Sequence, residues 1–253
     1  MLTEAGRIAL DHAEAIFRTA ADLTATLRDT GKARRALRVG ALATLSRNVQ
    51  MRFVGPLIGC ADVEVVLRSG SQPELLRALE SLTLDVVLTN LAPARDAANP
   101  WLVQPLDARP VSLTGTPARI GHRSVADLIA TEPLILPSPE TALRAAFDAF
   151  IARLGASPAI AAEADDMAML RLLARADAGL AVIPPIVARD ELASGLLVEA
   201  GRLDGISEHF LAVTLARRFP NPLLAGVLQA GAGTGDAASA APILPRGPQR
   251  PAG

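Results

Sequence analysis

The chain has 253 residues, half of them hydrophobic, with 25 Lys plus Arg against 26 Asp plus Glu and a formal net charge of −1. This charge balance excludes a chain that binds nucleic acid electrostatically along its whole surface. The absence of a run of about 18 strongly apolar residues argues against a transmembrane helix. Glu4 and Asp11 interrupt the first residues, so no secretory signal peptide is expected there, and the single Cys60 fits a cytoplasmic location.

A long amphipathic helix is expected at the start of the sequence. Thr3 suits its N-cap, the helical periodicity runs to about Arg28, and Gly31 suits its end. Small and apolar residues recur at a heptad-like spacing of four and three: Ala9, Ala13, Ile16, Ala20, Leu23 and Leu27. We interpret these residues as the seam of a dimerisation helix, with packing against the helix's own domain as the alternative.

Short apolar runs alternate with helical patterns from residue 36 onward. Strands are expected at 36–42, 63–70, 84–90, 101–106, 110–115, 133–138, 159–164, 179–185, 196–201 and 209–217. Helices are expected at 45–59, 73–82, 124–130, 140–155, 166–177, 186–195 and 221–231. This alternation predicts an α/β fold with parallel sheets and right-handed crossovers.

The elements fall into two α/β series, which predict two lobes. The first lobe would comprise residues 36–115 plus 206–231 and the second residues 116–205, after a linker helix over residues 1–31. The chain would cross between the lobes near 113–116 and again near 204–209, which predicts a hinge and a ligand cleft at the carboxyl ends of the strands. Residues 232–253 lack periodicity and are rich in Gly, Ala, Pro and Ser, so a disordered tail is predicted.

No catalytic or metal-binding set is apparent in the sequence. His12, His122 and His209 fall on unrelated predicted elements, and Cys60 has no nearby base to activate it. The spacings typical of zinc sites, phosphate-binding loops and dinucleotide-binding loops are absent. The sequence therefore favours a binding protein over an enzyme, and no cofactor or metal is expected.

Polar residues follow several predicted strands and open the next helix. Hydroxyl groups and free backbone N–H groups at such junctions suit small polar or anionic ligands, although ordinary helix capping explains each junction taken singly. Because the junctions should line one edge of two facing sheets, we predict an effector site there. Its residues would be Thr44, Ser46, Ser69, Gly70, Ser71 and Asn90 from the first lobe and Ser138 and Thr141 from the second.

The order of these motifs resembles that of LysR-type transcriptional regulators. The matching segments are LTEAG (2–6), ALRVGAL (36–42), LRSGS-x-x-ELLRALE (67–80), LDVVLTN (84–90), PLILPSPET (133–141), GLAVIPP (179–185) and LLVEAG (196–201). The resemblance implies a linker helix that pairs two subunits, followed by a two-lobed effector domain like that of periplasmic binding proteins. It also implies a small-molecule or ion effector, DNA as the partner of the full-length regulator, and a homodimer or homotetramer in the cytoplasm.

Two further features bear on that resemblance. The segments TLSR (44–47) and EAGRLDGISEHFLAV (199–213) resemble the NhaR-like branch, the activators of sodium/proton antiporter operons, which implies Na⁺, Li⁺ or osmotic and pH stress as the signal. The family's winged helix-turn-helix would precede LTEAG, and the sequence does not contain it. A misassigned start, a truncated gene and a stand-alone effector and dimerisation module all account for this.

Two other functions remain open from the sequence. A transport-type solute-binding protein shares the two-lobed fold, but it requires export, and the dimer-type helix at the front argues against it. A truncated, dominant-negative subunit that pairs with an intact regulator is the other alternative.

Overall fold

The computed structural model describes residues 35–94 and 101–232, without the side chains of the last two. Before residue 35 it describes only Thr3, Gly6, His12, Ala13, Ile16, Phe17, Thr19, Ala20, Leu23, Thr24 and Leu27. From His12 to Leu27 these isolated positions have helical backbone, but the continuous helix predicted over residues 1–31, including Ala9, lies outside the described residues. The predicted tail from residue 233 onward lies outside them as well.

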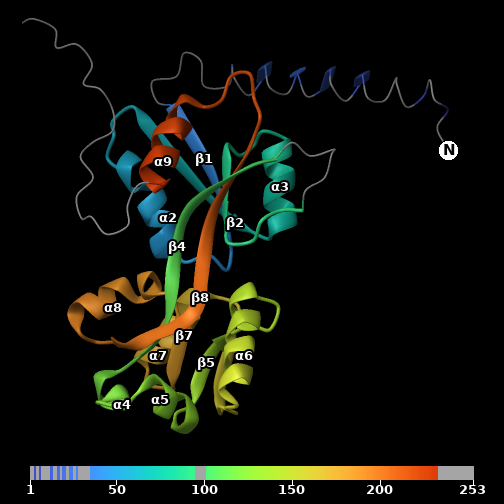
Figure 1. The fold of residues 1–253 in the computed structure, drawn as a ribbon. Coiled ribbons are helices and arrows are strands. Elements are labelled where there is room, and N and C mark those ends of the chain that lie inside the picture. The colour runs from blue at the N-terminus through green and yellow to red at the C-terminus, as the bar shows by residue number, and fades with distance from the viewer. Residues whose placement is uncertain are drawn as a thin grey trace, which may run out of the picture.

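The strands form one eight-stranded sheet in the order β2-β1-β3-β8-β4-β7-β5-β6 (Figure 1). The strands are β1 (Arg35–Leu42), β2 (Val63–Gly70), β3 (Val86–Thr89), β4 (Trp101–Gly115), β5 (Leu134–Pro137), β6 (Ile160–Ala164), β7 (Leu180–Ile183) and β8 (Val198–Leu215). Strand β1 pairs in parallel with β2 and β3, and β5 pairs in parallel with β6 and β7. The long strands β4 and β8 pair antiparallel with each other and join the two parallel groups.

Helices surround this sheet. They are α2 (Arg47–Val54), η1 (Gly55–Leu57), α3 (Gln72–Glu80), α4 (Pro117–Ile120), α5 (Val125–Thr131), α6 (Ala142–Leu154), α7 (Met167–Arg175), η2 (Pro185–Ala188), α8 (Arg189–Ser194) and α9 (Pro222–Ala232). The helix predicted over residues 45–59 changes to 3₁₀ geometry at Gly55 and Pro56, because proline supplies no backbone N–H. The short α4 was not predicted, and the helix predicted over 186–195 consists of η2 followed by α8.

Strands β4 and β8 run side by side through both halves of the molecule (Figure 1). The prediction of separate strands at 101–106 and 110–115, and at 196–201 and 209–217, was wrong, because each pair is one continuous strand. Register shifts after Pro105 and around Pro110 absorb the polar link between them, and a proline without an N–H is tolerated at such irregularities. We call β4 and β8 the hinge strands.

The buried side chains gather into separate clusters. In one half, α2 and α9 cover one face of the sheet, with Phe53, Val54 and Phe210 in the core, while Leu75 and Leu79 of α3 pack on the opposite face. We call this half lobe I. Lobe II contains α4 to α8 and β5 to β7, and its own cluster includes the residues 111 and 113 of β4.

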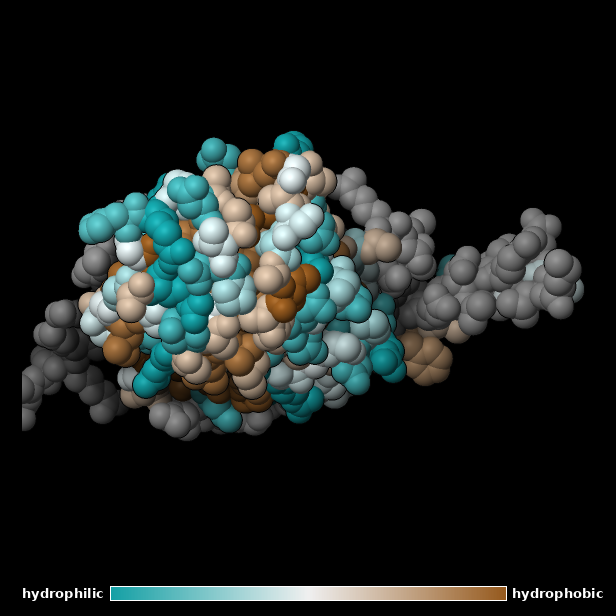
Figure 2. All heavy atoms as spheres, turned by 90° about the horizontal axis from the view of Figure 1, so that it is seen from below, coloured by the Kyte–Doolittle hydropathy of each residue, from teal (hydrophilic) through white to brown (hydrophobic). Residues whose placement is uncertain are grey.

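Among the residues that the structure describes, no helix is long and apolar enough to cross a bilayer. Figure 2, which views the molecule from below, shows hydrophilic and hydrophobic residues intermixed on that face. The exposed apolar side chains of lobe II include Leu154, Ile160 and Leu172.

Candidate functional site

Two loops at the carboxyl ends of β1 and β2 lie together in lobe I. The backbone N–H of Ala43 donates to the carbonyl oxygen of Gly70 at 3.0 Å. Arg47, the first residue of α2, donates from Nη1 to the hydroxyl oxygen of Ser69 at 2.9 Å. The structure therefore places the predicted residues that follow β1 beside those that follow β2, because parallel strands end at the same edge of the sheet.

The remaining predicted residues of these loops differ in how they are used. Ser46 is buried at the N-cap of α2, yet its side chain makes no capping hydrogen bond, and Thr44 lies in the preceding turn. Ser71 instead serves its own helix, since the Glu74 carboxylate accepts hydrogen bonds from the Ser71 backbone N–H at 2.9 Å and hydroxyl at 2.7 Å. Ser71 is thus engaged in capping its own helix, whereas Ser46 is not.

Asn90 reaches across to a hinge strand. Its Nδ2 donates to Oε1 of Glu208 in β8 at 2.8 Å, joining the end of β3 to a residue 118 positions later in the chain. Glu208 is only 6% exposed, and its other oxygen, Oε2, has no hydrogen-bond partner among the residues that the structure describes. Burial raises the pKa of the Glu208 carboxyl above its ordinary value, although the hydrogen bond from Asn90 acts in the opposite direction.

Asn48 of α2 ties the two lobes together. Its Nδ2 donates to the carbonyl oxygens of Ile186 at 2.9 Å and Val187 at 3.2 Å, both in η2 of lobe II. The Ile186 side chain packs against the core of lobe I, whereas Val187 belongs to the core of lobe II. The amide of Asn48 therefore holds the segment at which the cores of the two lobes meet.

A cluster of three charged side chains lies beside these contacts. Asp107 and Arg109 belong to the hinge strand β4, and Arg52 belongs to α2. Oδ2 of Asp107 in β4 accepts from Nη1 of Arg52 at 2.6 Å and from Nε of Arg109 at 2.7 Å. Arg109 stands directly opposite Glu208 in the register of β4 and β8. Side chains of directly opposed residues project to the same face of a sheet, so Glu208 shares its face with this group.

The predicted residues of lobe II form a separate junction. The Thr141 hydroxyl donates to the carbonyl oxygen of Ser138 at 2.9 Å, and Thr141 Oγ1 accepts from the backbone N–H of Arg144 at 3.1 Å, which caps α6. These hydrogen bonds stay within lobe II. In the described parts of the chain, no hydrogen bond brings Ser138 or Thr141 to the predicted residues of lobe I.

Two hydroxyl groups on β4 are buried without a partner. Ser112 and Thr114 are both 0% exposed, and neither Oγ of Ser112 nor Oγ1 of Thr114 makes a hydrogen bond within the described parts of the chain. Ser112 lies opposite Ile183, the last residue of β7, and therefore near the edge of the lobe II sheet where η2 begins. Buried hydroxyl groups normally have hydrogen-bond partners, so these two groups of β4 can each form a hydrogen bond that the fold does not supply.

Sequence reasoning missed Glu208, Asn48 and Ser112. A signal for Glu208 was present, because Ile206, Glu208 and Phe210 alternate along β8 and all three are buried. A carboxylate in the inward series of a strand is rarely left in an apolar core without a role. No comparable signal exists for Asn48, whose partners are backbone carbonyl groups on another lobe.

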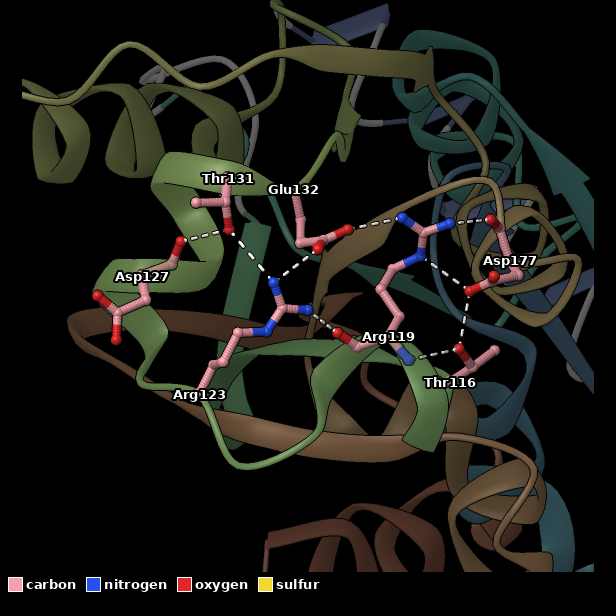
Figure 3. Close-up of polar contacts among 7 residues, drawn as sticks. All are labelled: Thr116, Arg119, Arg123, Asp127, Thr131, Glu132 and Asp177. Atoms are coloured by element: carbon pink, nitrogen blue, oxygen red, sulfur yellow. Dashed lines mark hydrogen bonds and ion pairs between the residues drawn. The ribbon is translucent and has the colours of Figure 1, made fainter.

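A second charged network lies near the end of lobe II away from lobe I (Figures 1 and 3). Arg119 pairs with Glu132 at 2.7 Å and with Asp177 at 2.8 Å, and Arg123 pairs with Glu132 at 2.7 Å. Hydrogen bonds from Arg123 and Arg119 lower the pKa of the Glu132 carboxyl, and those from Arg119 and Thr116 lower that of Asp177. These contacts join α4, α5 and the turn before β7, so the network stabilises the fold of lobe II.

Within residues 35–94 and 101–232 and the few described positions before them, no group of three or more His, Cys, Asp and Glu side chains could hold a metal ion. The Cys60 thiol approaches the carbonyl oxygen of Pro56 at 3.7 Å and is half-buried.

Comparisons with known proteins agree with the architecture. A family model described as the LysR substrate binding domain matches residues 30–232. The fold is similar to full-length CbnR complexed with its target DNA (TM-score 0.63, 18% identity, 92% of this chain and 83% of that chain). It is also similar to HinK, a LysR family transcriptional regulator from Pseudomonas aeruginosa (TM-score 0.60, 20% identity, 91% of this chain and 80% of that chain).

A regulatory domain with a bound small molecule is similar too. The CcmR regulatory domain of Synechocystis PCC6803 in complex with 2-PG aligns with a TM-score of 0.58 and 16% identity, covering 79% of this chain and 96% of that chain. At these identities the solved structures support the fold alone. No curated protein matches the sequence closely enough to count as a relative.

Proposed function

Since the chain belongs to the LysR substrate-binding-domain family, we propose that it is the effector-sensing and dimerisation part of a LysR-type transcriptional regulator. Its fold is the two-lobed α/β fold of that family, which consists of transcription regulators and not of enzymes. We further propose that it acts in the cytoplasm. The domain division is proposed to follow the predicted lobes, residues 36–115 plus 206–231 and residues 116–205.

The observation that carries this proposal is a set of polar groups near the hinge. Ser46 is buried without a capping bond, Glu208 keeps an unpartnered oxygen, and Asn48 contacts the opposite lobe. A small molecule bound there would touch both lobes. Binding that differs in strength between two lobe arrangements would shift their populations, as allosteric control requires.

The effector is proposed to contact the predicted residues from both lobes. Thr44, Ser46, the loop from Ser69 to Ser71, and Asn90 would hold it from lobe I. Ser138 and Thr141 would approach from lobe II when the lobes close. The N-terminal turn of α2 suits a polar or anionic group of the ligand, since its first backbone N–H groups have no partners within the helix.

The linker helix would carry the signal to DNA. We propose that it pairs two subunits through Ala9, Ala13, Ile16, Ala20, Leu23 and Leu27. Where the structure describes them, Ile16, Leu23 and Leu27 are each more than half exposed, at 67%, 59% and 56%, so a second helix has an apolar surface to cover. A homodimer or homotetramer would then set the spacing of the DNA-binding heads of a full-length regulator.

A screen of small molecules by thermal shift tests the site. A true effector should raise the melting temperature of the wild-type chain, and Ser46→Asp should abolish that rise by placing a charge at the buried N-cap. Ser157→Asp, in an exposed loop of lobe II, is the matched control and should respond as wild type does. If a saturating effector stabilised Ser46→Asp as much as wild type, the site would lie elsewhere.

The resemblance to NhaR-like activators suggests the first ions to test. We propose Na⁺ or Li⁺ as a candidate signal, on the basis of the segments 44–47 and 199–213. Melting curves in NaCl or LiCl should then lie above those in choline chloride at the same ionic strength. Identical curves in the three salts would contradict the antiporter branch while leaving the regulator proposal intact.

A further inference from the structure

The Glu208 carboxylate has an unusual environment for a buried acid. Its side chain is 6% exposed, Oε1 accepts one hydrogen bond from Asn90 at 2.8 Å, and Oε2 accepts none. A buried carboxylate is normally paired with a cation or surrounded by donors, because removing an ion from water is costly. The oxygen Oε2 of Glu208 can therefore accept a hydrogen bond that the fold does not supply.

The neighbouring cations do not supply the missing donor. Arg109, which is opposite Glu208 in the hinge register, directs Nε to Asp107, and Arg52 directs Nη1 to the same Asp107 oxygen. The side chains of Arg52 and Arg109 are 26% and 23% exposed, so solvent screens their charge. Glu208 is buried far more deeply, so water offsets less of the charge on its carboxylate.

The position of Glu208 connects it with the carboxyl edge of the lobe I sheet. Its hydrogen-bond partner Asn90 directly follows β3, whose end lies beside the end of β1 in the parallel part of the sheet. Ligands of open α/β sheets bind outside these strand ends. Glu208 also lies on a strand that continues into lobe II, so a ligand contact made there acts on the hinge itself (Figure 1).

We propose that Glu208 is a specificity-determining residue of the effector site and selects an effector that carries an N–H cation, such as an amine, amidine or guanidine. Oε2 accepts the hydrogen bond from this group, and Asn90 holds the carboxylate in place. A cation fits better than a neutral donor because it also neutralises the buried charge. This inference rests on the proposed function, since it names the chemical class recognised at the same site.

The test is a thermal-shift library of primary amines, amidines and guanidines, with and without a carboxylate, each matched with a hydroxyl isostere of the same shape. The wild-type chain should respond to cationic members and not to their isosteres. In Glu208→Gln the dissociation constant of each hit should rise roughly ten- to a hundred-fold, the range of a lost charged hydrogen bond. Glu199→Gln, an exposed acid on the same strand, is the control and should keep wild-type affinity.

A calorimetric readout separates recognition from a general structural effect. If Glu208 is protonated before binding and ionised afterwards, amine binding should release a proton, and the binding enthalpy should depend on the ionisation enthalpy of the buffer in wild type but not in Glu208→Gln. Cationic hits that bind Glu208→Gln as tightly as wild type would overturn the inference. Hits confined to neutral or anionic compounds would overturn it as well, while leaving the regulator proposal standing. The absence of any hit in all classes would count against both.

Discussion

Glu208 lies in the candidate site, and burial of its carboxylate lowers the stability of the folded chain. Because burial raises its pKa in the folded chain, the stability linked to this group is fully present below its unfolded pKa and is lost as the pH rises through the raised value. Asp107, Arg52 and Arg109 face the same side of the hinge strands. Both arginines pair with Asp107.

Glu208→Gln should therefore stabilise the chain in mildly alkaline solution. We expect a gain on the order of 1 kcal/mol at pH 8, because a neutral amide replaces a buried charge but still leaves one group incompletely paired. Denaturant unfolding at several pH values measures this, and the gain should shrink as the pH falls. A variant less stable than wild type at pH 8 would show that the carboxylate is compensated in the fold.

Asn48 offers a second test at the residue scale. Asn48→Ala removes the donor shared by the carbonyl oxygens of Ile186 and Val187 and should cost about 1 kcal/mol of stability. Amide hydrogen exchange should quicken in η2 and α8 more than in the parallel strands of lobe I. Gln72→Ala, which removes a side-chain bond to the Leu91 carbonyl oxygen within one lobe, is the control and should leave exchange in η2 unchanged.

At the scale of elements, the N-terminal helix is the proposed dimerisation element. Ile16→Asp combined with Leu23→Asp should raise the dimer dissociation constant roughly a hundred-fold, since charges would replace apolar seam residues. Analytical ultracentrifugation measures the shift to monomer. Thr19→Asp, an exposed position outside the predicted seam, should leave the dimer intact. An unchanged dimer in the double variant would place the subunit contact on another surface.

The network of α4 and α5 should act only on stability. Glu132 and Asp177 have lowered pKa values, so the stability linked to them is present above their unfolded values and is lost as the pH falls through the lowered folded values. Arg119→Met should lower the melting temperature by a few degrees at neutral pH, and the difference from wild type should narrow in acid. A constant difference down to acidic pH would mean that lost packing, and not charge pairing, causes the effect.

The order of the elements could be predicted because apolar runs and helical periodicity are local properties. The continuity of the two hinge strands could not be predicted, since Asp107 and Gly205 look like turn residues and only the long-range pairing of β4 with β8 carries the strands past them. The same limit applies at the site. Asn90 was predicted from its place after a strand, but its partner Glu208 lies 118 residues away, and no local pattern joins the two.

At the scale of the whole molecule, two cores are joined by a pair of strands and by the contacts of η2. Lobe I and lobe II each have their own buried cluster, and the hinge strands contribute residues to both. Two packed bodies joined by a few chain crossings are the arrangement in which hinge motions occur. An effector bound at the hinge is expected to change this arrangement.

Measuring the distance between spin labels on the two lobes is the direct test of this change. With Cys60 replaced by Ser, labels at Glu80→Cys in lobe I and Arg153→Cys in lobe II would report the separation of the lobes. A compound that stabilises the wild-type chain should shift this distance distribution, and Ser46→Asp should remove the shift. A compound that binds wild type at one site per chain and leaves the distribution unchanged would contradict this expectation.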